Sequence, residues 1–216
     1  MTKAEAWEIT GGLSNTHKMP GQSWGISPFR CVIGQKMAQV EGSTCAECYA
    51  MQRHYRYLNV MKAHERRYQQ MLRALEDAEF RRLYIEAFVF LINNEPHFRW
   101  FDAGDIQSVE HLRLISEICE ATPRTEHWLP TRELPFLKEY LFKYGAPPSN
   151  LVVRASSAMI DGPPPEAEWM EEFGILTSGV SSTGDHDCPA ESQGGVCGAC
   201  RRCWDRDVPH VTYKLI

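Results

Sequence analysis

The chain has 216 residues, of which 43% are hydrophobic and 24% are charged, a balance typical of one globular domain with a sizeable core. Its net charge of −5 argues against a generally basic nucleic-acid binder, and no stretch approaches the ~20 apolar residues of a membrane span. The N-terminus lacks the apolar core of a signal peptide, so the eight cysteines indicate metal ligation in a reducing compartment, which we expect to be the cytoplasm.

The first fifty residues are rich in Gly, Ser and Pro and show little regular periodicity. This composition predicts a long structured loop, and long loops inside compact domains tend to be functional. Helical character begins near Cys45 and continues, with a break, to Asn94. Its clearest part is an apolar stripe from Phe80 to Leu91, and residues 93–96 (NNEP) are expected to stop the helix.

From residue 96 onward the pattern alternates between strands and helices. Ser108 is the predicted cap of one helix, and Gly145 ends the next. The predicted strands cover residues 98–101, 126–129, 151–155 and 175–178. Such alternation implies right-handed crossovers and a mostly parallel sheet. Four to six strands are too few for a closed eight-stranded barrel, so we expect an α/β fold built as a partial, open barrel.

Polar residues follow each predicted strand. The four clusters are residues 102–105, 131–133, 156–157 and 181–183. Turn chemistry explains any single cluster, but ligands of such sheets bind beyond the C-terminal strand ends, so four clusters on one rim predict a site. In this site Gly104 and Asp105 are expected to hold a cofactor or substrate. The expected lining residues are Arg132, Arg154, Ser156 and Ser181.

Four cysteines near the C-terminus form the most informative motif. Cys197, Cys200 and Cys203 make an overlapping C-x2-C-x2-C run, and Cys188 precedes them. A zinc site usually takes two separate C-x2-C knuckles, whereas a run at steps of three is typical of iron–sulfur proteins. We therefore predict a four-thiolate [4Fe-4S] cluster, with zinc as the alternative. A disulfide framework is disfavoured because close neighbours in such a run do not easily pair.

A second group of cysteines lies in the N-terminal loop and comprises Cys31, Cys45 and Cys48. Three thiolates can hold a four-iron cluster and leave one iron open to a small molecule, which is typical of a reactive cluster. The alternative is that Cys31 is a buried small residue and that Cys45 and Cys48 share a lone zinc. The eighth cysteine, Cys119, lies on an apolar helix face and is expected to be a core thiol.

Several longer motifs carry a resemblance to a known family. They are residues 18–21 (KMPG), 42–50 (GSTCAECYA), 98–108 (FRWFDAGDIQS), 128–132 (WLPTR) and 197–204 (CGACRRCW). Together they span most of the chain and resemble the bacteriophage gene-product-eighty-eight proteins. The resemblance implies a phage or prophage origin, and therefore the host cytoplasm, but transfers no activity.

A second, mechanistic resemblance is to the radical S-adenosylmethionine enzymes, which are partial α/β barrels. Three cysteines ending in Cys48-Tyr49 ahead of a long helix resemble their cluster loop, and Tyr49 is accordingly expected near the cofactor. Gly104-Asp105 resembles the Gly-Gly-Glu segment that binds the methionine amino group, and the C-terminal cysteines resemble auxiliary clusters. The chain departs from that pattern in two ways: thirteen residues separate Cys31 from Cys45, and one glycine precedes the acid.

Asp102 and Asp105 support a different hypothesis. Two carboxylates three residues apart at one strand end could act as acid and base or as nucleophile and acid. That arrangement resembles the guanine transglycosylases, zinc-containing transferases that exchange nucleobases. The structural alternative is that Asp105 caps the following helix while Asp102 pairs with Arg99 or Arg132.

A weaker signal concerns nucleic acid. Residues 65–67 (ERR) form a charged run with Tyr55, Tyr57 and Tyr68 nearby, which could meet a nucleic-acid backbone. The ordinary interpretation is a solvated helical face, with His64 as a surface group.

We therefore predict a partial barrel over residues 1–184 and a four-cysteine extension over residues 185–216, packed as one domain. The expected function is that of a radical-type iron–sulfur enzyme acting on a small molecule or nucleotide, with nucleic acid as a possible partner and no membrane. The expected catalytic groups are Asp102, Asp105 and Arg132. The alternatives are a zinc nucleobase transferase with Asp102 and Asp105 as its working carboxylates, or a non-catalytic zinc module that binds a host protein or DNA.

Overall fold

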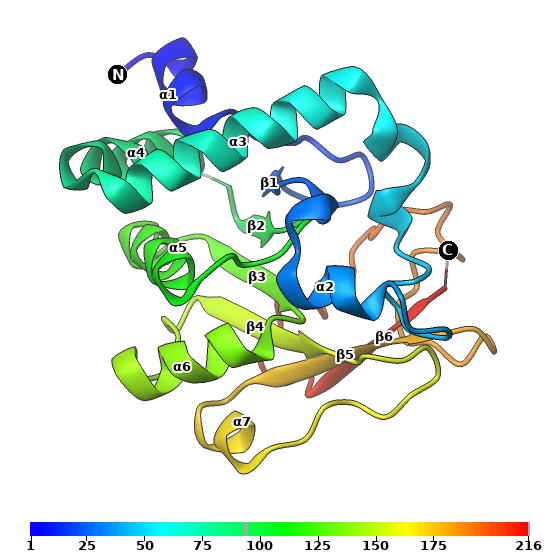
Figure 1. Ribbon diagram of the computed structural model, residues 1–216. Coiled ribbons are helices and arrows are strands. Elements are labelled where there is room, and N and C mark those ends of the chain that lie inside the picture. The colour runs from blue at the N-terminus through cyan, green and yellow to red at the C-terminus, as the bar shows by residue number, and fades with distance from the viewer. Residues whose placement is uncertain (93–94, 216) are drawn as a thin grey trace.

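The computed structural model describes residues 1–92 and 95–215, and this part of the chain contains one open, six-stranded sheet (Figure 1). The strands are β1 (Ser23–Trp24), β2 (His97–Trp100), β3 (Glu126–Thr131), β4 (Leu151–Ser156), β5 (Leu176–Ser181) and β6 (His210–Lys214). They pair in chain order, and every pairing is parallel. The prediction of an α/β fold with a partial, open barrel is confirmed.

The four predicted strands correspond to β2 through β5, and the two outer strands are additions. β1 has only two residues, too few to show the alternation that identifies a strand from sequence. β6 is an edge strand in which Val211 alone is buried, so its pattern is also weak. Pairing with a neighbouring strand, rather than local periodicity, defines both of these outer strands.

The helices run between the strands as the alternation predicts. They are α1 (Lys3–Thr10), α2 (Val32–Met37), α3 (Leu58–Glu76), α4 (Ala78–Ile92), α5 (Val109–Ala121), α6 (Leu134–Tyr144) and α7 (Glu168–Glu172), with 3-10 turns η1 (Pro28–Arg30), η2 (Tyr49–Met51) and η3 (Arg53–Arg56). Ser108 caps α5 by accepting a hydrogen bond from the His111 amide at 3.1 Å, as expected.

The long helix starts later than its sequence suggests. Its predicted start at Cys45 is wrong, because residues 45–57 form turns and the first α-helical residue is Leu58. The hydroxyls of Tyr49 and Tyr55 both bind the carbonyl oxygen of Asp102, which ties these turns to the end of β2. The break in the helix falls at Asp77, whose carboxylate accepts from the first amides of α4. Residues 93–94 of the predicted stop lie outside the described residues.

The sheet buries both of its faces. Leu129 and Val153 point into the main core under helices α3 to α6, which pack side by side in chain order (Figure 1). Trp128 and Val211 point to the opposite face, where they pack against Cys203 and Trp204. Alternate strand residues face opposite sides of a sheet, so this second face requires its own cover.

Residues 185–215 provide that cover and also complete the sheet. The segment lies on the side away from α5 and α6, in orange and red in Figure 1, and its last strand is β6. Trp204 Nε1 donates to the carbonyl oxygen of Phe98 at 2.9 Å, and Arg154 donates to the carbonyl oxygens of Cys203, Arg202 and Asp205. The four-cysteine segment is therefore fixed to the sheet by buried polar contacts.

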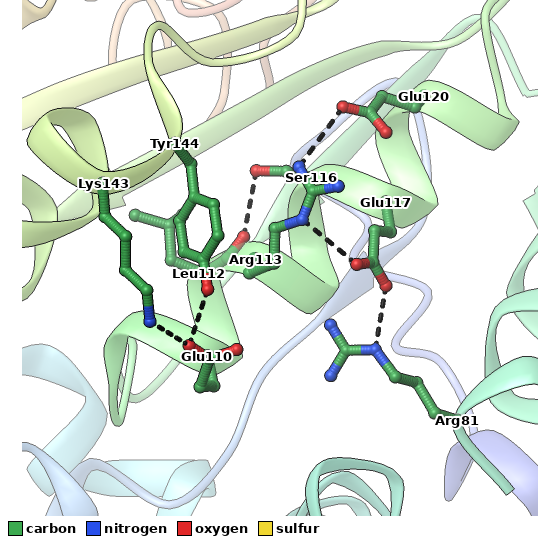
Figure 2. Close-up of polar contacts among 9 residues, drawn as sticks. All are labelled: Arg81, Glu110, Leu112, Arg113, Ser116, Glu117, Glu120, Lys143 and Tyr144. Carbon is green, nitrogen blue, oxygen red and sulfur yellow. Dashed lines mark hydrogen bonds and ion pairs between the residues drawn. The ribbon is translucent and has the colours of Figure 1, made fainter. Parts of the chain in front are cut away.

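Charged side chains join α4, α5 and α6 on their outer side (Figure 2). Glu117 accepts from Arg81 of α4 at 2.9 Å and from Arg113 of α5 at 3.1 Å. Glu110 accepts from Lys143 and Tyr144 at the end of α6. Partly exposed pairs of this kind stabilise a fold by under about 1 kcal/mol each, so they contribute little to the stability of the helix layer. Within residues 1–92 and 95–215, no helix combines the length and apolarity needed to cross a membrane.

Candidate functional site

The C-terminal ends of β2, β3 and β4 meet at one edge of the sheet, and the candidate site lies there. A sharp turn follows β2, in which Phe101 has a φ of 57° and Gly104 a φ of 81°. A Cβ on Gly104 would lie 2.5 Å from Ile26 Cγ1 and 2.7 Å from Ile26 O, so only glycine fits this approach. A positive φ at a bulky residue such as Phe101 costs energy and is found most often at functional sites.

Asp105 connects this turn to the end of β3. Its Oδ1 accepts from Thr131 Oγ1 at 2.6 Å and from the Ile106 amide at 2.8 Å, and its Oδ2 accepts from the Arg132 amide at 2.8 Å. Burial raises the pKa of Asp105 to about 7, and the hydrogen bond from Thr131 opposes that rise. Asp105 therefore does not cap α5; it fixes the position of Thr131 and Arg132.

Asp102 is buried beside the same turn. Its carbonyl oxygen accepts from Tyr49 and Tyr55, whereas its Oδ1 has no hydrogen-bond partner among the described residues. Arg99 donates instead to the Tyr49 hydroxyl at 3.1 Å, and the Arg132 guanidinium donates to Thr44 and Cys45. The ion pair considered for Asp102 with either arginine is thus not what the structure contains.

The N-terminal cysteine loop, residues 31–48, lies across the strand ends. Glu133 accepts from the amides of Val32 and Ile33, both at 2.7 Å, and so holds the start of α2. Thr44 donates through its amide to the carbonyl oxygen of Ala158 at 3.0 Å, just beyond β4. Burial raises the pKa of Glu133, and the amide donors oppose this rise. The loop is therefore attached to the sheet at two strand ends besides the contact through Tyr49.

This arrangement brings Cys31 and Cys45 together although thirteen residues separate them. A Cβ built on Gly34 would lie 3.6 Å from Cys31 Sγ and 3.7 Å from Cys45 Sγ, so both sulfurs border one small space that glycine leaves open. Burial raises the pKa of Cys31 far above its usual value, with further rises from Asp105 and Cys48. Burial also raises the pKa of Cys45, and the Arg132 guanidinium, 3.1 Å from its sulfur, opposes the rise.

The C-terminal cysteines form a second group on the other face of the sheet. The Cys188 amide donates to Thr212 of β6 and the Cys197 amide donates to Lys18 of the N-terminal loop. Burial raises the pKa of Cys197, with a further rise from Cys188, and burial raises the pKa of Cys203 to about 11. All eight cysteines are free thiols. In the described residues, no three Cys, His, Asp or Glu side chains converge closely enough to hold one metal ion.

Comparison with known proteins identifies the family. The family model of Gene product 88 matches residues 30–206. The chain belongs to the gene product 88 family. The matched region includes all seven cysteines of the two groups, and the match confirms the resemblance drawn from the sequence motifs. No curated protein and no solved structure matches the chain.

Other expected site residues of this gene product 88 protein lie in different places. Arg154 is fully buried and its guanidinium donates to backbone carbonyls of the C-terminal segment, on the face away from the N-terminal cysteines. Ser181 belongs to a polar pocket of about 280 Å³ at the ends of β5 and β6. Arg132 and Ser156 border a larger cleft of about 490 Å³ beside Cys45. The expected lining residues thus divide among three locations.

The charged run at residues 65–67 is not a simple solvated face. His64 and Arg67 are 2% and 4% exposed, so the prediction of surface groups is wrong for both. Arg67 donates to the carbonyl oxygens of Gly12 and Gly25 and holds the N-terminal loop against α3. Helical periodicity did not reveal this, because the N-terminal loop that covers α3 belongs to a distant part of the sequence.

Two residues of the site were not among the predicted site residues. Gly34 provides the space between two sulfurs, and Arg99 lies 4.5 Å from the Trp128 ring while donating to Tyr49. The charge of Arg99 also opposes the rise in the pKa of Cys197 and Cys203 that burial causes. Arg99 therefore lies between the loop of the first cysteine group and the second group, a position that only the sheet register defines.

Proposed function

We propose that this gene product 88 protein is an iron–sulfur enzyme whose reactive centre is held by Cys31, Cys45 and Cys48. The observation that carries the proposal is the shared space at Gly34, bordered by the sulfurs of Cys31 and Cys45 at the C-terminal edge of a parallel sheet. Ligands of such folds bind at this edge. A four-iron cluster held by three thiolates would keep one iron without a protein ligand. When bound here, such a cluster can donate an electron to a small molecule at that iron.

The chemistry of the donor set supports the same proposal. Burial raises the pKa of Cys31 and of Cys45, yet metal ligation requires thiolates. Arg132 is the cation that favours the Cys45 thiolate, and a bound inorganic group would supply the remaining positive charge. Arg132 would hold the Cys45 sulfur by its hydrogen bond, and Asp105 would hold Arg132 in place through the backbone amide.

The second cysteine group would hold another cluster, with Cys188, Cys197, Cys200 and Cys203 as its ligands. Arg99 would connect the two centres, because it contacts Tyr49 and electrostatically favours the thiolates of Cys197 and Cys203. We propose reductive cleavage of a small molecule or nucleotide in the host cytoplasm as the reaction class. S-adenosylmethionine is a candidate co-substrate, but Asp105 would not bind it directly, since hydrogen bonds within the protein occupy both carboxylate oxygens.

A zinc-containing nucleobase transferase is the second candidate. The observation that favours it is the buried Oδ1 of Asp102, which has no hydrogen-bond partner in the part of the chain that the structure describes and is therefore available to a bound group. Thiolates on one zinc ion lie ~2.3 Å from the metal and hence roughly 4 Å from one another. A zinc site therefore requires shorter distances between the cysteine sulfurs than a four-iron cluster does.

Metal analysis distinguishes the two candidates. Protein purified without oxygen is expected to be brown and to contain several iron and sulfide per chain. Cys45→Ser and Cys200→Ser should each lose about half of the iron, one from each group, whereas Cys119→Ser should retain it because Cys119 is buried in the main core. A colourless protein with stoichiometric zinc and no sulfide would replace the first candidate with the second.

A further inference from the structure

An apolar cleft of about 490 Å³ opens beside the N-terminal cysteine group. One wall is α2, which contributes Ile33 and Met37, and the other includes Leu134 at the start of α6 and Met159 after β4. Three consecutive prolines, 163–165, also line the cleft. The volume lies within the range of roughly 300–1,000 Å³ found for small-molecule sites, and methionines adapt to ligands of varied shape.

Arg132 is the charged residue among those that line the cleft. The hydrogen bonds of its guanidinium among the described residues go from Nη1 to Thr44 and Cys45, and no carboxylate there lies within ion-pair distance. An arginine presents five N–H donors in a planar fork suited to a carboxylate or phosphate. The Arg132 guanidinium is half-buried at the border of the apolar cleft and has N–H donors beyond those used for Thr44 and Cys45. It is therefore complementary to a ligand that carries one anionic group and is otherwise apolar.

We propose that this cleft binds the substrate of the neighbouring centre as a small organic acid, with an aromatic or branched apolar body and one carboxylate at Arg132. The inference rests on the proposed function for the role of substrate, while binding itself does not require a cluster. A nucleoside polyphosphate fits the cleft poorly, because several negative charges would meet one arginine among apolar walls. The distance of 3.1 Å between Arg132 Nη1 and Cys45 Sγ would place the carboxylate end nearest the thiolates.

The test uses a matched pair of probes, hydrocinnamate and its neutral amide, titrated into the full-length protein with isotope-labelled methionine methyl groups. Both probes should shift the Met37 and Met159 signals, and Met71, which is buried in the main core, should not respond. The acid should bind about tenfold more tightly than the amide, the value of one good charge-assisted hydrogen bond. Arg132→Gln should reduce the affinity for the acid to that for the amide. Arg132→Lys should keep part of the preference, and the surface variant Arg82→Gln should keep all of it.

Equal affinity of the unmodified protein for the two probes would overturn the proposal. So would shifts confined to methionines outside the cleft, or no binding up to the solubility limit of the acid. Iron and sulfide are measured on the same samples, so the two proposals fail separately. Iron-free protein that still prefers the acid supports the cleft while contradicting the cluster, and iron-loaded protein that binds neither probe contradicts the cleft alone.

Discussion

Gly34 shows how one residue can shape the candidate site. A methyl group there would lie 2.9 Å from Cys31 Cβ, closer than side-chain carbons approach, and would occupy the space between two sulfurs. Arg132 acts on the same space from the other side through its hydrogen bond to Cys45. At this scale the site is a small opening lined by sulfur, with one cation and two buried carboxylates, Asp105 and Glu133, around it.

The raised pKa of Asp105 predicts that the free energy of unfolding depends on pH. Its folded-state pKa is raised to about 7 by burial, so the folded protein retains a proton that the unfolded chain releases above about pH 4. The stability contributed by the protonated form is therefore lost as pH rises through about 7. Relative to Asp105→Asn, the unmodified protein should lose up to about 4 kcal/mol of unfolding free energy between pH 4 and pH 7, measured by urea titration.

Asp161→Asn is the control for that experiment. Hydrogen bonds from the hydroxyl and the amide of Ser182 lower the pKa of this exposed carboxylate. Its contribution should therefore be small and of opposite sign, present at neutral pH and lost on acidification. A stability difference between the unmodified protein and Asp105→Asn that is constant from pH 4 to 8 would contradict the raised pKa of Asp105.

At the scale of elements, buried side chains fasten loops to strand ends. Glu133 holds the start of α2 and thereby the position of Cys31. On the other face, Arg154 of β4 donates to four carbonyl oxygens, three of them in the segment that carries Cys203. Both residues follow or belong to central strands, so the sheet sets the geometry of both cysteine groups.

Arg154→Met should therefore destabilise the C-terminal segment, chiefly through the lost hydrogen bonds rather than through the lost positive charge. The variant leaves buried carbonyl oxygens without donors, which should cost about 3 kcal/mol in unfolding free energy. Limited proteolysis should then cleave within residues 185–209 faster than in the unmodified protein. Arg206→Met is the matched control, because Arg206 donates to three carbonyl oxygens, against four for Arg154, but is exposed. It should cost below about 1 kcal/mol. Equal losses in the two variants would remove the special role assigned to Arg154.

At the scale of the whole molecule, two neutral histidines are built into the core. His111 lies against the Trp24 and Phe101 rings and accepts from the Gln107 amide, and His127 is buried beside Thr122. Burial lowers the pKa of each histidine to about 3. The unfolded chain would protonate both near pH 6.5, so folding holds them in their uncharged form.

This arrangement predicts acid lability. Each histidine contributes stability that is present above about pH 6.5 and is lost as pH falls toward 3, at about 3 kcal/mol each by pH 4.5. Urea unfolding at pH 7 and pH 4.5 should show the loss, and His127→Gln should reduce the difference between the two pH values. His17→Gln, at an exposed position, should behave as the unmodified protein does. A difference between pH 4.5 and pH 7 that His127→Gln leaves unchanged would contradict the prediction, because the opposing contribution of Asp105 is the same in both proteins.

Much of the fold could be predicted because its signals are local. The apolar runs of β3 and β4, the cap at Ser108 and the C-terminal Cys-x2-Cys-x2-Cys run depend on residues a few positions apart. Predictions from local sequence were wrong where contacts with a distant segment determine the backbone conformation or the burial of a side chain. The turns before α3 are held by Asp102, and Arg67 of α3 is buried where it donates to Gly12 and Gly25 of the N-terminal loop.

The sequence by itself therefore determined the alternation of strands and helices, the family and the two groups of cysteines. Tertiary structure alone decided that Cys31 and Cys45 lie beside Gly34 and that Arg132 borders both a thiol and an apolar cleft. It also decided that Arg154 binds the C-terminal segment on the opposite face of the sheet. The physical reason is that periodicity and capping are properties of neighbouring residues. Convergence of positions up to about a hundred residues apart depends instead on strand order and register, because the parallel pairing of β2, β3 and β4 brings their C-terminal ends to one edge.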